Sequence, residues 1–382
     1  MNRSRSRYML PMAAAALGLT VSLVLVETIP RLLPGLMPRK LQAVQRIYDA
    51  RNTWEDMMQG DKDLGFCLKP GLDLRFPSEA GQIAIRTTDT GVGGIGYRDI
   101  GTKAPYDAVA VGDSFTFCDD SQPENCWVRL LGQKTGLSFA DLGVNGYSNE
   151  AEVRMISKVA STMKPKLIVL GFFPNDFKDN VHFHNWAASG TTDDYWTWMR
   201  RKRRSDASDW LAENSILFRL VDAARRYGKR DTAEYREGGL DFVFRDDDWW
   251  QGVVEDAGVT QTYEYTKQAL SNAQAEAKKA GARLVVLLFP FKEQVYWDIA
   301  RKYSGESGHL TEAEIDAPLR RVGEYLASQH IDYCDLTGDL RGKAHEEQLY
   351  LRTSAHWTAA GNRVAADAIA SCLAGKGAVA LH

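Results

Sequence analysis

The chain has 382 residues, of which 44% are hydrophobic and 25% are charged, which suits one large globular domain or two. A formal net charge of −3 gives no general attraction to nucleic acid, and five cysteines are too few for a disulfide scaffold. The composition therefore argues against a basic nucleic-acid-binding protein and against a small cysteine-rich domain.

The N-terminus predicts a membrane anchor. Three arginines within the first seven residues precede a mostly apolar run from about Tyr8 to Val26, about the length that a helix needs to cross a bilayer. Basic residues before such a span favour a cytoplasmic N-terminus with the rest of the chain outside. The small residues from Ala13 to Ala16 leave a cleaved signal peptide open, but no small-x-small cleavage site follows the run. We expect residues 1–36 to be an uncleaved anchor.

Residues 37–103 predict a stalk and a small β subdomain. The stretch from Met37 to Met58 is polar and helix-prone, whereas Leu64 to Tyr97 is rich in glycine and in short β-type runs. The segment Gly91–Gly96 has the spacing of a dinucleotide fingerprint, but no helical pattern begins within it. We therefore expect a glycine turn there and no bound cofactor.

Residues 104–382 alternate strand and helix patterns. Strands are predicted at about 108–111, 138–142, 167–173, 283–289 and 331–336. Helices are predicted between them, at about 127–135, 150–163, 262–280 and 311–330. The alternation indicates an α/β fold, and we expect a flavodoxin-like three-layer α/β/α sandwich with a central parallel sheet.

A helical insertion, residues 182–259, interrupts this alternation after the third strand. It holds a segment of tryptophans and basic residues, 195–204, followed by an amphipathic pattern from Trp210 to Arg226. Such a pattern suits a helix on an anionic membrane surface, and a solvated basic face on a lid helix is the alternative. In either case we expect the insertion to cover the substrate side.

Ser114 stands directly after the buried strand 108–111. In open parallel α/β sheets, ligands bind at the carboxyl ends of the strands, so a hydroxyl here is well placed for chemistry. On this segment alone, a simple helix cap explains the serine equally well.

Three later segments follow the same pattern of a polar or glycine residue at a strand end or helix start. They carry Gly146 (in 142–147), Asn175 (in 170–176) and His356 (in 354–361). With Ser114, these four blocks in this order resemble the SGNH (GDSL) hydrolase superfamily over residues 104–374. The resemblance implies that Ser114 is the nucleophile and His356 the general base. It also implies that the backbone N–H groups of Ser114 and Gly146 and the Asn175 amide stabilise an oxyanion, with no metal or cofactor.

The sequence departs from the superfamily pattern at one important position. The family places an aspartate two or three residues before the histidine, where this chain has Thr353 and Ser354. Either hydroxyl, a backbone carbonyl or a remote acid could orient the imidazole instead, and an inactive site is the further alternative. The remote acids considered are Asp335, Asp339, Glu346 and Glu347.

The cysteines allow two bridges. Cys118 and Cys126 flank one short loop after Ser114, and Cys334 ends a predicted strand while Cys372 lies on the last helix. Either bridge would fit an exported protein, and five small buried thiols are the alternative.

The sequence therefore predicts a membrane-anchored serine hydrolase at the outer face of the bacterial inner membrane. Its substrate would be an ester, with O-acyl groups on a glycan as a guess from the compartment and the family. An O-acyltransferase that uses the same site and a non-catalytic glycan-binding module remain alternatives. A membrane-surface scaffold built on the basic tryptophan segment is a third.

Overall fold

The computed structural model describes residues 3–37, 39–203, 206–227, 232–245, 249–302 and 310–380. Arg204, which belongs to the basic tryptophan segment, lies outside the described residues. The chain divides into two compact units: residues 1–54 with 201–230, and residues 55–200 with 231–382.

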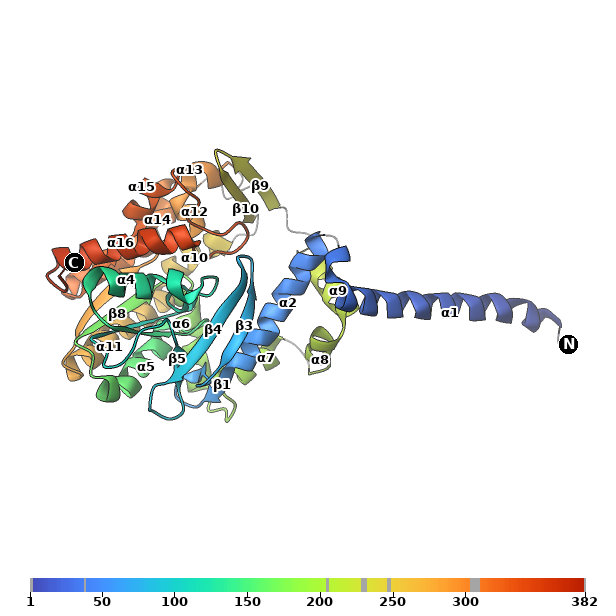
Figure 1. Ribbon diagram of the computed structural model, residues 1–382, viewed down its shortest axis with the longest axis horizontal. Coiled ribbons are helices and arrows are strands. Elements are labelled where there is room, and N and C mark those ends of the chain that lie inside the picture. The colour runs from blue at the N-terminus through green and yellow to red at the C-terminus, as the bar shows by residue number, and fades with distance from the viewer. Residues whose placement is uncertain are drawn as a thin grey trace. The chain divides into compact units, whose positions relative to one another are not determined.

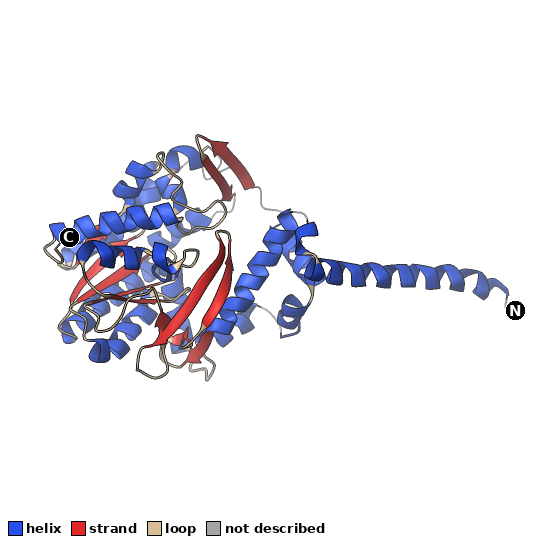
Figure 2. Ribbon diagram, viewed as in Figure 1, coloured by secondary structure: helices blue, strands red, loops and turns tan. Residues whose placement is uncertain are grey.

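Five parallel strands form the centre of the second unit (Figures 1 and 2). In spatial order they are β7 (Phe139–Gly143), β6 (Ala108–Gly112), β8 (Leu167–Phe172), β11 (Arg283–Leu288) and β12 (Asp332–Asp335). In chain order this arrangement is 2-1-3-4-5, the flavodoxin-like order. The predicted α/β class is confirmed.

The sequence of these strands explains their place at the centre. Every residue of β6, β7 and β8 is buried, and all of them except Asp141 of β7 are apolar or glycine, as in strands covered on both faces. Ala108 of β6 pairs with Phe139 on one side and with Leu167 on the other. The carboxyl ends of these three strands therefore meet at one edge of the sheet.

Helices cover both faces of this sheet, as Figure 2 shows. On one face lie α4 (Trp127–Thr135) and α16 (Ala359–Gly375); on the other lie α5 (Asn149–Met163), α11 (Thr260–Lys279) and α14 (Glu312–Ser328). Two helices on one face and three on the other agree with right-handed crossovers in this strand order. A disulfide between Cys334 of β12 and Cys372 of α16 (S–S 2.04 Å) ties the last helix to the edge of the parallel strands.

The strands before residue 100 extend the central sheet, so that it is mixed. They are β1 (Met58–Asp61), β2 (Gly65–Leu68), β3 (Asp73–Ser78), β4 (Gly81–Asp89) and β5 (Gly96–Arg98). β5 pairs antiparallel with β7 through Arg98 and Asp141, so these strands do not form a separate sheet. Residues 91–95 form the turn between β4 and β5, and no helix begins there.

The insertion contains helices and one β hairpin. Its elements are the end of α6 (Asp176–Ala188), then α7 (Tyr195–Arg203), α8 (Asp206–Asn214), α9 (Ile216–Tyr227), β9 (Thr232–Glu237), β10 (Leu240–Arg245) and α10 (Trp249–Gly258). The antiparallel β9–β10 pair was not predicted.

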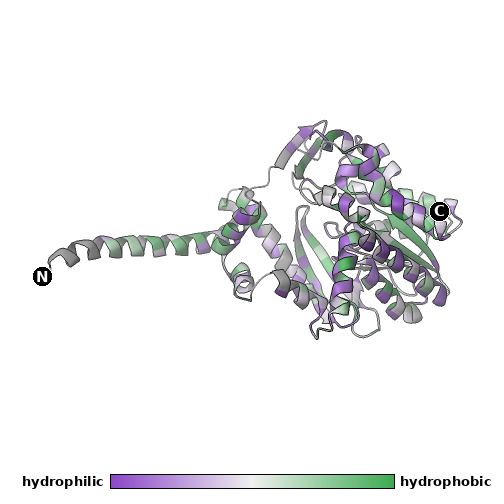
Figure 3. Ribbon diagram, turned by 180° about the vertical axis from the view of Figure 1, so that it is seen from behind, coloured by the Kyte–Doolittle hydropathy of each residue, from purple (hydrophilic) through white to green (hydrophobic). Residues whose placement is uncertain are grey.

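The first unit is helical and begins with α1 (Arg3–Leu32), along which apolar residues extend (Figure 3). By length and composition, its segment Pro11–Leu32 could cross a membrane, as an anchor or as a signal. The short helix η1 (Pro34–Leu36) and α2 (Arg39–Met57) follow. Within this unit α2 is bonded to α9, because the Tyr48 hydroxyl donates to Asp222 (2.6 Å) and Arg219 pairs with Asp49 (3.1 Å).

Candidate active site

Ser114 begins a short helix that rests directly on the ends of the central strands. This helix is α3 (Ser114–Phe117), and the carboxylate of Asp113 caps it by accepting from the Phe115 N–H at 2.9 Å. Glycines make the close approach possible. A Cβ atom on Gly143 would lie 2.2 Å from the Phe117 nitrogen, and one on Gly112 would lie 2.1 Å from the Thr116 hydroxyl. The strand ends therefore hold the Ser114 hydroxyl at the edge of the sheet.

His356 reaches the same edge from the loop before α16. Its Nε2 lies 2.9 Å from the Ser114 Oγ, although the two residues are 242 positions apart in the chain. The Leu351 N–H donates to the His356 carbonyl oxygen (2.9 Å), and the Phe115 ring packs edge-on against the imidazole with centroids 5.2 Å apart. Both Ser114 and His356 are partly exposed, so a substrate can reach them.

The carboxylate on the other side of the imidazole belongs to Asp120. Its Oδ2 lies 2.7 Å from His356 Nδ1 and accepts from the Ser354 hydroxyl at 2.9 Å, while its Oδ1 accepts from the Ser78 hydroxyl at 2.5 Å. Burial acts to raise the pKa of Asp120, but the hydrogen bond and charge of His356 and the two serine hydroxyls outweigh it and lower the pKa. Ser114, His356 and Asp120 thus have the hydrogen-bonded order of a Ser-His-Asp triad.

Asp120 is a remote acid that the sequence analysis did not name as a candidate for orienting His356. Among the predicted candidates, Ser354 does contact Nδ1, at 3.1 Å, but Thr353 bonds to Glu79 instead. Asp335 accepts from the Thr337 N–H (2.9 Å) at the start of α15 (Thr337–Lys343), and Asp339 is exposed on that helix. In the described part of the chain, no hydrogen bond or ion pair joins either aspartate to His356.

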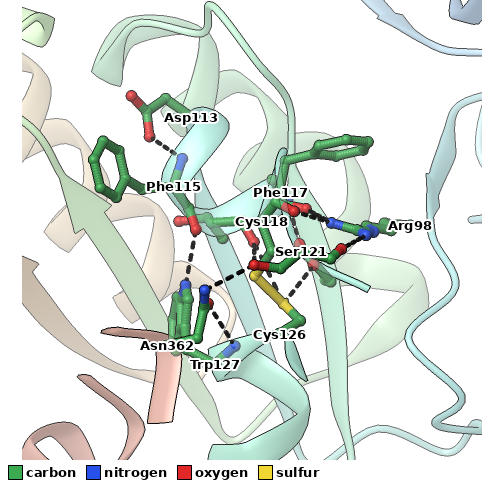
Figure 4. Close-up of a disulfide and its surroundings, with 12 residues drawn as sticks. Arg98, Asp113, Phe115, Phe117, Cys118, Ser121, Cys126, Trp127 and Asn362 are labelled. Atoms are coloured by element: carbon green, nitrogen blue, oxygen red, sulfur yellow. Dashed lines mark hydrogen bonds between the residues drawn. A yellow bond between two sulfur atoms is a disulfide. The ribbon is translucent and has the colours of Figure 1, made fainter. Parts of the chain in front are cut away.

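The loop that carries Asp120 is closed by a disulfide (Figure 4). Cys118 and Cys126 are bonded, eight positions apart, and Asp120 lies between them. The fully buried Arg98 donates to the carbonyl oxygens of Phe117, Cys118 and Ser121. These bonds fix the loop backbone on the side of β5.

Asn362 holds the same loop from α16. Its Nδ2 donates to the Ser121 hydroxyl (2.9 Å), and its Oδ1 accepts from the Trp127 N–H (3.1 Å), as Figure 4 shows. The Trp127 indole N–H in turn donates to the Phe115 carbonyl oxygen at 3.0 Å. The acid, the nucleophile and the helix after the histidine are therefore joined through one buried set of hydrogen bonds.

The tip of the β3–β4 hairpin contacts both the acid and the histidine loop. Besides Ser78 on Asp120, the carboxylate of Glu79 accepts from the N–H groups of Thr353 (2.9 Å) and Ser354 (3.2 Å). The Gln122 side chain, two residues after Asp120, bonds the hairpin backbone at Ala84 and Gln82. The hairpin thus supports the site, although no sequence motif marks it.

Asn175 and Gly146 lie where their neighbouring strands end. Asn175 precedes α6 at the end of β8, and its Nδ2 donates to Asp179 at 2.9 Å. Its side chain also hydrogen-bonds Asp113: burial raises the pKa of Asp113, and the bond to Asn175 offsets part of that rise. Gly146 is exposed in the turn after β7 with φ of 78°, a conformation that favours glycine. Their roles as oxyanion donors stay predictions.

Acidic groups dominate the electrostatics around His356. Burial acts to lower the pKa of the imidazole, but the hydrogen bond and charge of Asp120 and the charges of Asp119 and Asp113 outweigh it and raise the pKa to about 9. Burial raises the pKa of Asp119 to about 7 and that of Asp113 to about 6. The raised pKa makes the neutral imidazole a stronger base, so it removes the proton of Ser114 more readily once it is neutral.

A family model for an SGNH hydrolase-like domain, described for the acetyltransferase AlgX, matches residues 241–381. The matched residues include β11, β12, α16 and His356. Ser114 lies before the matched residues in the chain. Together with the strand order, it identifies the fold as SGNH hydrolase-like. A comparison with curated proteins gives no match.

Solved structures similar to this chain include a member of the lipolytic G-D-S-L family from Veillonella parvula (13% identity, 69% of this chain and 96% of that one, TM-score 0.37). A GDSL-like lipase from Bacteroides thetaiotaomicron has 12% identity over 71% of this chain and 89% of its own, with a TM-score of 0.34. A catalytic mutant of an acetylxylan esterase from Geobacillus stearothermophilus has 12% identity over 70% and 94%, with a TM-score of 0.37. Similarities at this level do not establish a function.

Proposed function

We propose that the chain is an ester-acting serine enzyme whose main activity is O-acyl transfer, from an acyl ester to a hydroxyl group of a glycan. The observation that carries the proposal is the hydrogen-bonded series from Ser114 through His356 to Asp120 at the open edge of the sheet. The match to a family described for an acetyltransferase supports transfer, with acetyl as the acyl group, over the hydrolysis expected from the sequence alone.

In the first half of the reaction, Ser114 Oγ attacks the carbonyl carbon of the donor ester while His356 Nε2 takes the hydroxyl proton. Asp120 holds the imidazole by Nδ1 and stabilises its charged form. The negative charge on the carbonyl oxygen is stabilised by the N–H groups of Ser114 and Gly146 and by the Asn175 amide. The tetrahedral intermediate then expels the donor alcohol, which receives the proton from His356, and Ser114 is left acylated.

In the second half, the acceptor hydroxyl attacks the acyl-enzyme and gives its proton to His356 Nε2. Collapse of this intermediate releases the new ester, and the proton returns to Ser114 Oγ. Water in place of the sugar hydroxyl would give hydrolysis by the same groups. Which of the two prevails depends on how far the site excludes water.

The acceptor is tested with the full chain, an aryl acetate donor and O-deacetylated oligosaccharides, with products followed by mass spectrometry. Transfer predicts acetylated oligosaccharide that forms at the expense of free acetate and is missing with Ser114→Ala. Acetate release that no acceptor changes would identify a hydrolase. A chain that binds oligosaccharide but turns over no ester would contradict the enzyme and support a glycan-binding module.

We further propose that α1 is an uncleaved anchor in the bacterial inner membrane, with the rest of the chain outside the cytoplasm. The apolar segment Pro11–Leu32 and the basic residues before it support this topology. The disulfides Cys118–Cys126 and Cys334–Cys372 support an oxidising compartment. A mature N-terminus that begins after Val26 would contradict the anchor.

The pH dependence of the reaction follows from His356. Because its pKa lies at about 9, the imidazole is protonated below that pH and cannot accept the Ser114 proton. We expect kcat/KM for an aryl acetate to rise about ten-fold per pH unit between about pH 6 and about pH 8 and to level near about pH 9. Initial rates corrected for spontaneous hydrolysis measure the profile, and a plateau already reached at about pH 6 would contradict His356 as the base.

The support from the hairpin tip predicts that Glu79→Ala lowers kcat roughly ten-fold, an effect of about 1.4 kcal/mol on the transition state. The variant removes the acceptor for the N–H groups of Thr353 and Ser354, and so loosens the loop that positions His356. Asp73→Ala is the matched control, because Asp73 lies at the other end of the same hairpin and pairs with the exposed Arg86. Equal rates for both variants and the unmodified chain would show that the tip does not position the histidine.

A further inference from the structure

The apolar helix α1 carries a carboxylate near its end. Glu27 lies five residues before the end of the segment Pro11–Leu32. Charged side chains are costly within a membrane and are found there with partners. The Glu27 carboxylate accepts hydrogen bonds from three consecutive residues: from the Ser215 hydroxyl (2.6 Å) and from the backbone N–H groups of Ile216 (2.9 Å) and Leu217 (3.0 Å).

Ser215 directly precedes α9, and Ile216 and Leu217 begin it, so Glu27 caps that helix from a different part of the chain. Figure 1 shows α9 beside the end of α1. Arg31 completes the arrangement by bonding the Glu27 carboxylate (3.0 Å) and the Asn214 carbonyl oxygen. At 1.5 Å per residue, Glu27 lies about 8 Å before Leu32 along the helix. The turn between α8 and α9 is therefore held at the level where α1 would leave the bilayer.

The neighbouring turn of α8 exposes large apolar side chains. Trp210 is 62% exposed and Leu211 is 36% exposed, and Trp210 lies one helical turn before Asn214. Leu32, the last residue of α1, and Leu33, which follows it, are 74% and 54% exposed. Apolar groups that gather beside a span in this way mark contact with a membrane, and tryptophan is enriched at the membrane–water interface.

The position of α8 is fixed, because α9 is also bonded to α8 and to α2. Arg219 is buried, donates to the Ala212 carbonyl oxygen at 2.6 Å and pairs with Asp49 of α2 at 3.1 Å. The α8–α9 pair is thus tied to α1 through Glu27 and to α2 through Arg219. Trp210 and Leu211 nevertheless stay exposed on α8, as Val221 does on α9.

We propose that α8 and the α8–α9 turn form an interfacial membrane-binding element, in which Trp210 and Leu211 insert among lipid headgroups and upper acyl chains. The inference rests on the proposed role of α1 as a membrane span. The partner is the lipid surface itself, recognised by apolar area, so binding does not require anionic lipid. The element would fix the orientation of α1 and prevent its rotation about its own axis.

The test uses the full chain in phospholipid vesicles, with an environment-sensitive fluorophore on one introduced cysteine at a time. Trp210→Cys reports on α8, Val21→Cys on the middle of α1, and Ser328→Cys on an exposed position of α14 as the aqueous control. Leu211→Cys repeats the α8 measurement with Trp210 kept. The unmodified chain gives the background from the buried Cys67 thiol. Quenching is measured with doxyl groups placed high on the lipid chains and with aqueous iodide.

We expect the labels at 210 and 211 to be quenched at least about three-fold more by the shallow lipid quencher than the label at 328, and to be protected from iodide. If the label at 21 is in lipid while those at 210 and 211 behave like the label at 328, the interfacial element is refuted and the anchor stands. If the label at 21 is also accessible to iodide, both the anchor and the element are refuted. Aryl-ester turnover of each labelled chain shows whether the ester-acting site is intact, independently of either result.

Discussion

Asp120→Asn should lower kcat about ten-thousand-fold, the loss that follows when the acid of a serine triad becomes an amide. The asparagine can occupy the same space, but it cannot stabilise the imidazolium, and it favours the wrong tautomer of His356. The pH profile should change as well. Asp120 contributes most of what raises the pKa of His356, so the midpoint of the profile should move to lower pH. Steady-state rates across pH measure both effects.

Asp335→Asn and Asp339→Asn are the matched controls, because the sequence made these two acids candidates for the same role. Both are exposed and neither contacts the histidine in the described part of the chain, so each should keep turnover within about two-fold of the unmodified protein. Circular dichroism and melting temperature show whether the Asp120 variant is folded. A folded Asp120→Asn protein with near-normal turnover and an unshifted profile would remove Asp120 from the mechanism.

Ser114→Ala should abolish turnover, with a loss of about a million-fold in kcat and of all labelling by a fluorophosphonate probe. The change removes only the nucleophilic oxygen, and Asp113 still caps α3, so the fold should be kept. Ser328→Ala, at an exposed position of α14, is the control and should label as the unmodified chain does. Full labelling of the Ser114 variant, with the probe located on another residue, would place the nucleophile elsewhere.

The sequence was sufficient to predict the central strands and the proximity of Ser114 to His356. Runs such as Ala108–Val111 are apolar throughout, which suits a strand that is buried on both faces. Parallel strands then bring their ends to one edge, so residues that follow them become neighbours whatever their separation in the chain. The two cysteine pairs that the sequence left as possible bridges also bond in the structure.

The acid could not be predicted in the same way, because its position depends on a loop rather than on a strand end. Asp120 reaches His356 through a turn that is closed by a disulfide and held by Arg98 and by the tip of a hairpin. These are contacts between distant segments, and no periodicity marks them. One signal was available: Asp119 and Asp120 are adjacent acids in a loop that a bridge between Cys118 and Cys126 would hold against the nucleophile.

The pairing of β5 with β7 was missed for a related reason. The strands before residue 100 are short, and a single pair, Arg98 with Asp141, joins them to the central sheet. Short β-type runs predict that strands exist, but not which strand they pair with.

The proposed mechanism requires an acyl group on Ser114, which rapid-quench mass spectrometry of the chain can detect. After brief mixing with an aryl acetate at about pH 8 without acceptor, the peptide that contains Ser114 should carry one acetyl group. The modification should form at the rate of the product burst and disappear when an oligosaccharide acceptor is added. Steady turnover with no acetyl on this peptide, or with acetyl on another residue, would contradict an acyl-enzyme at Ser114.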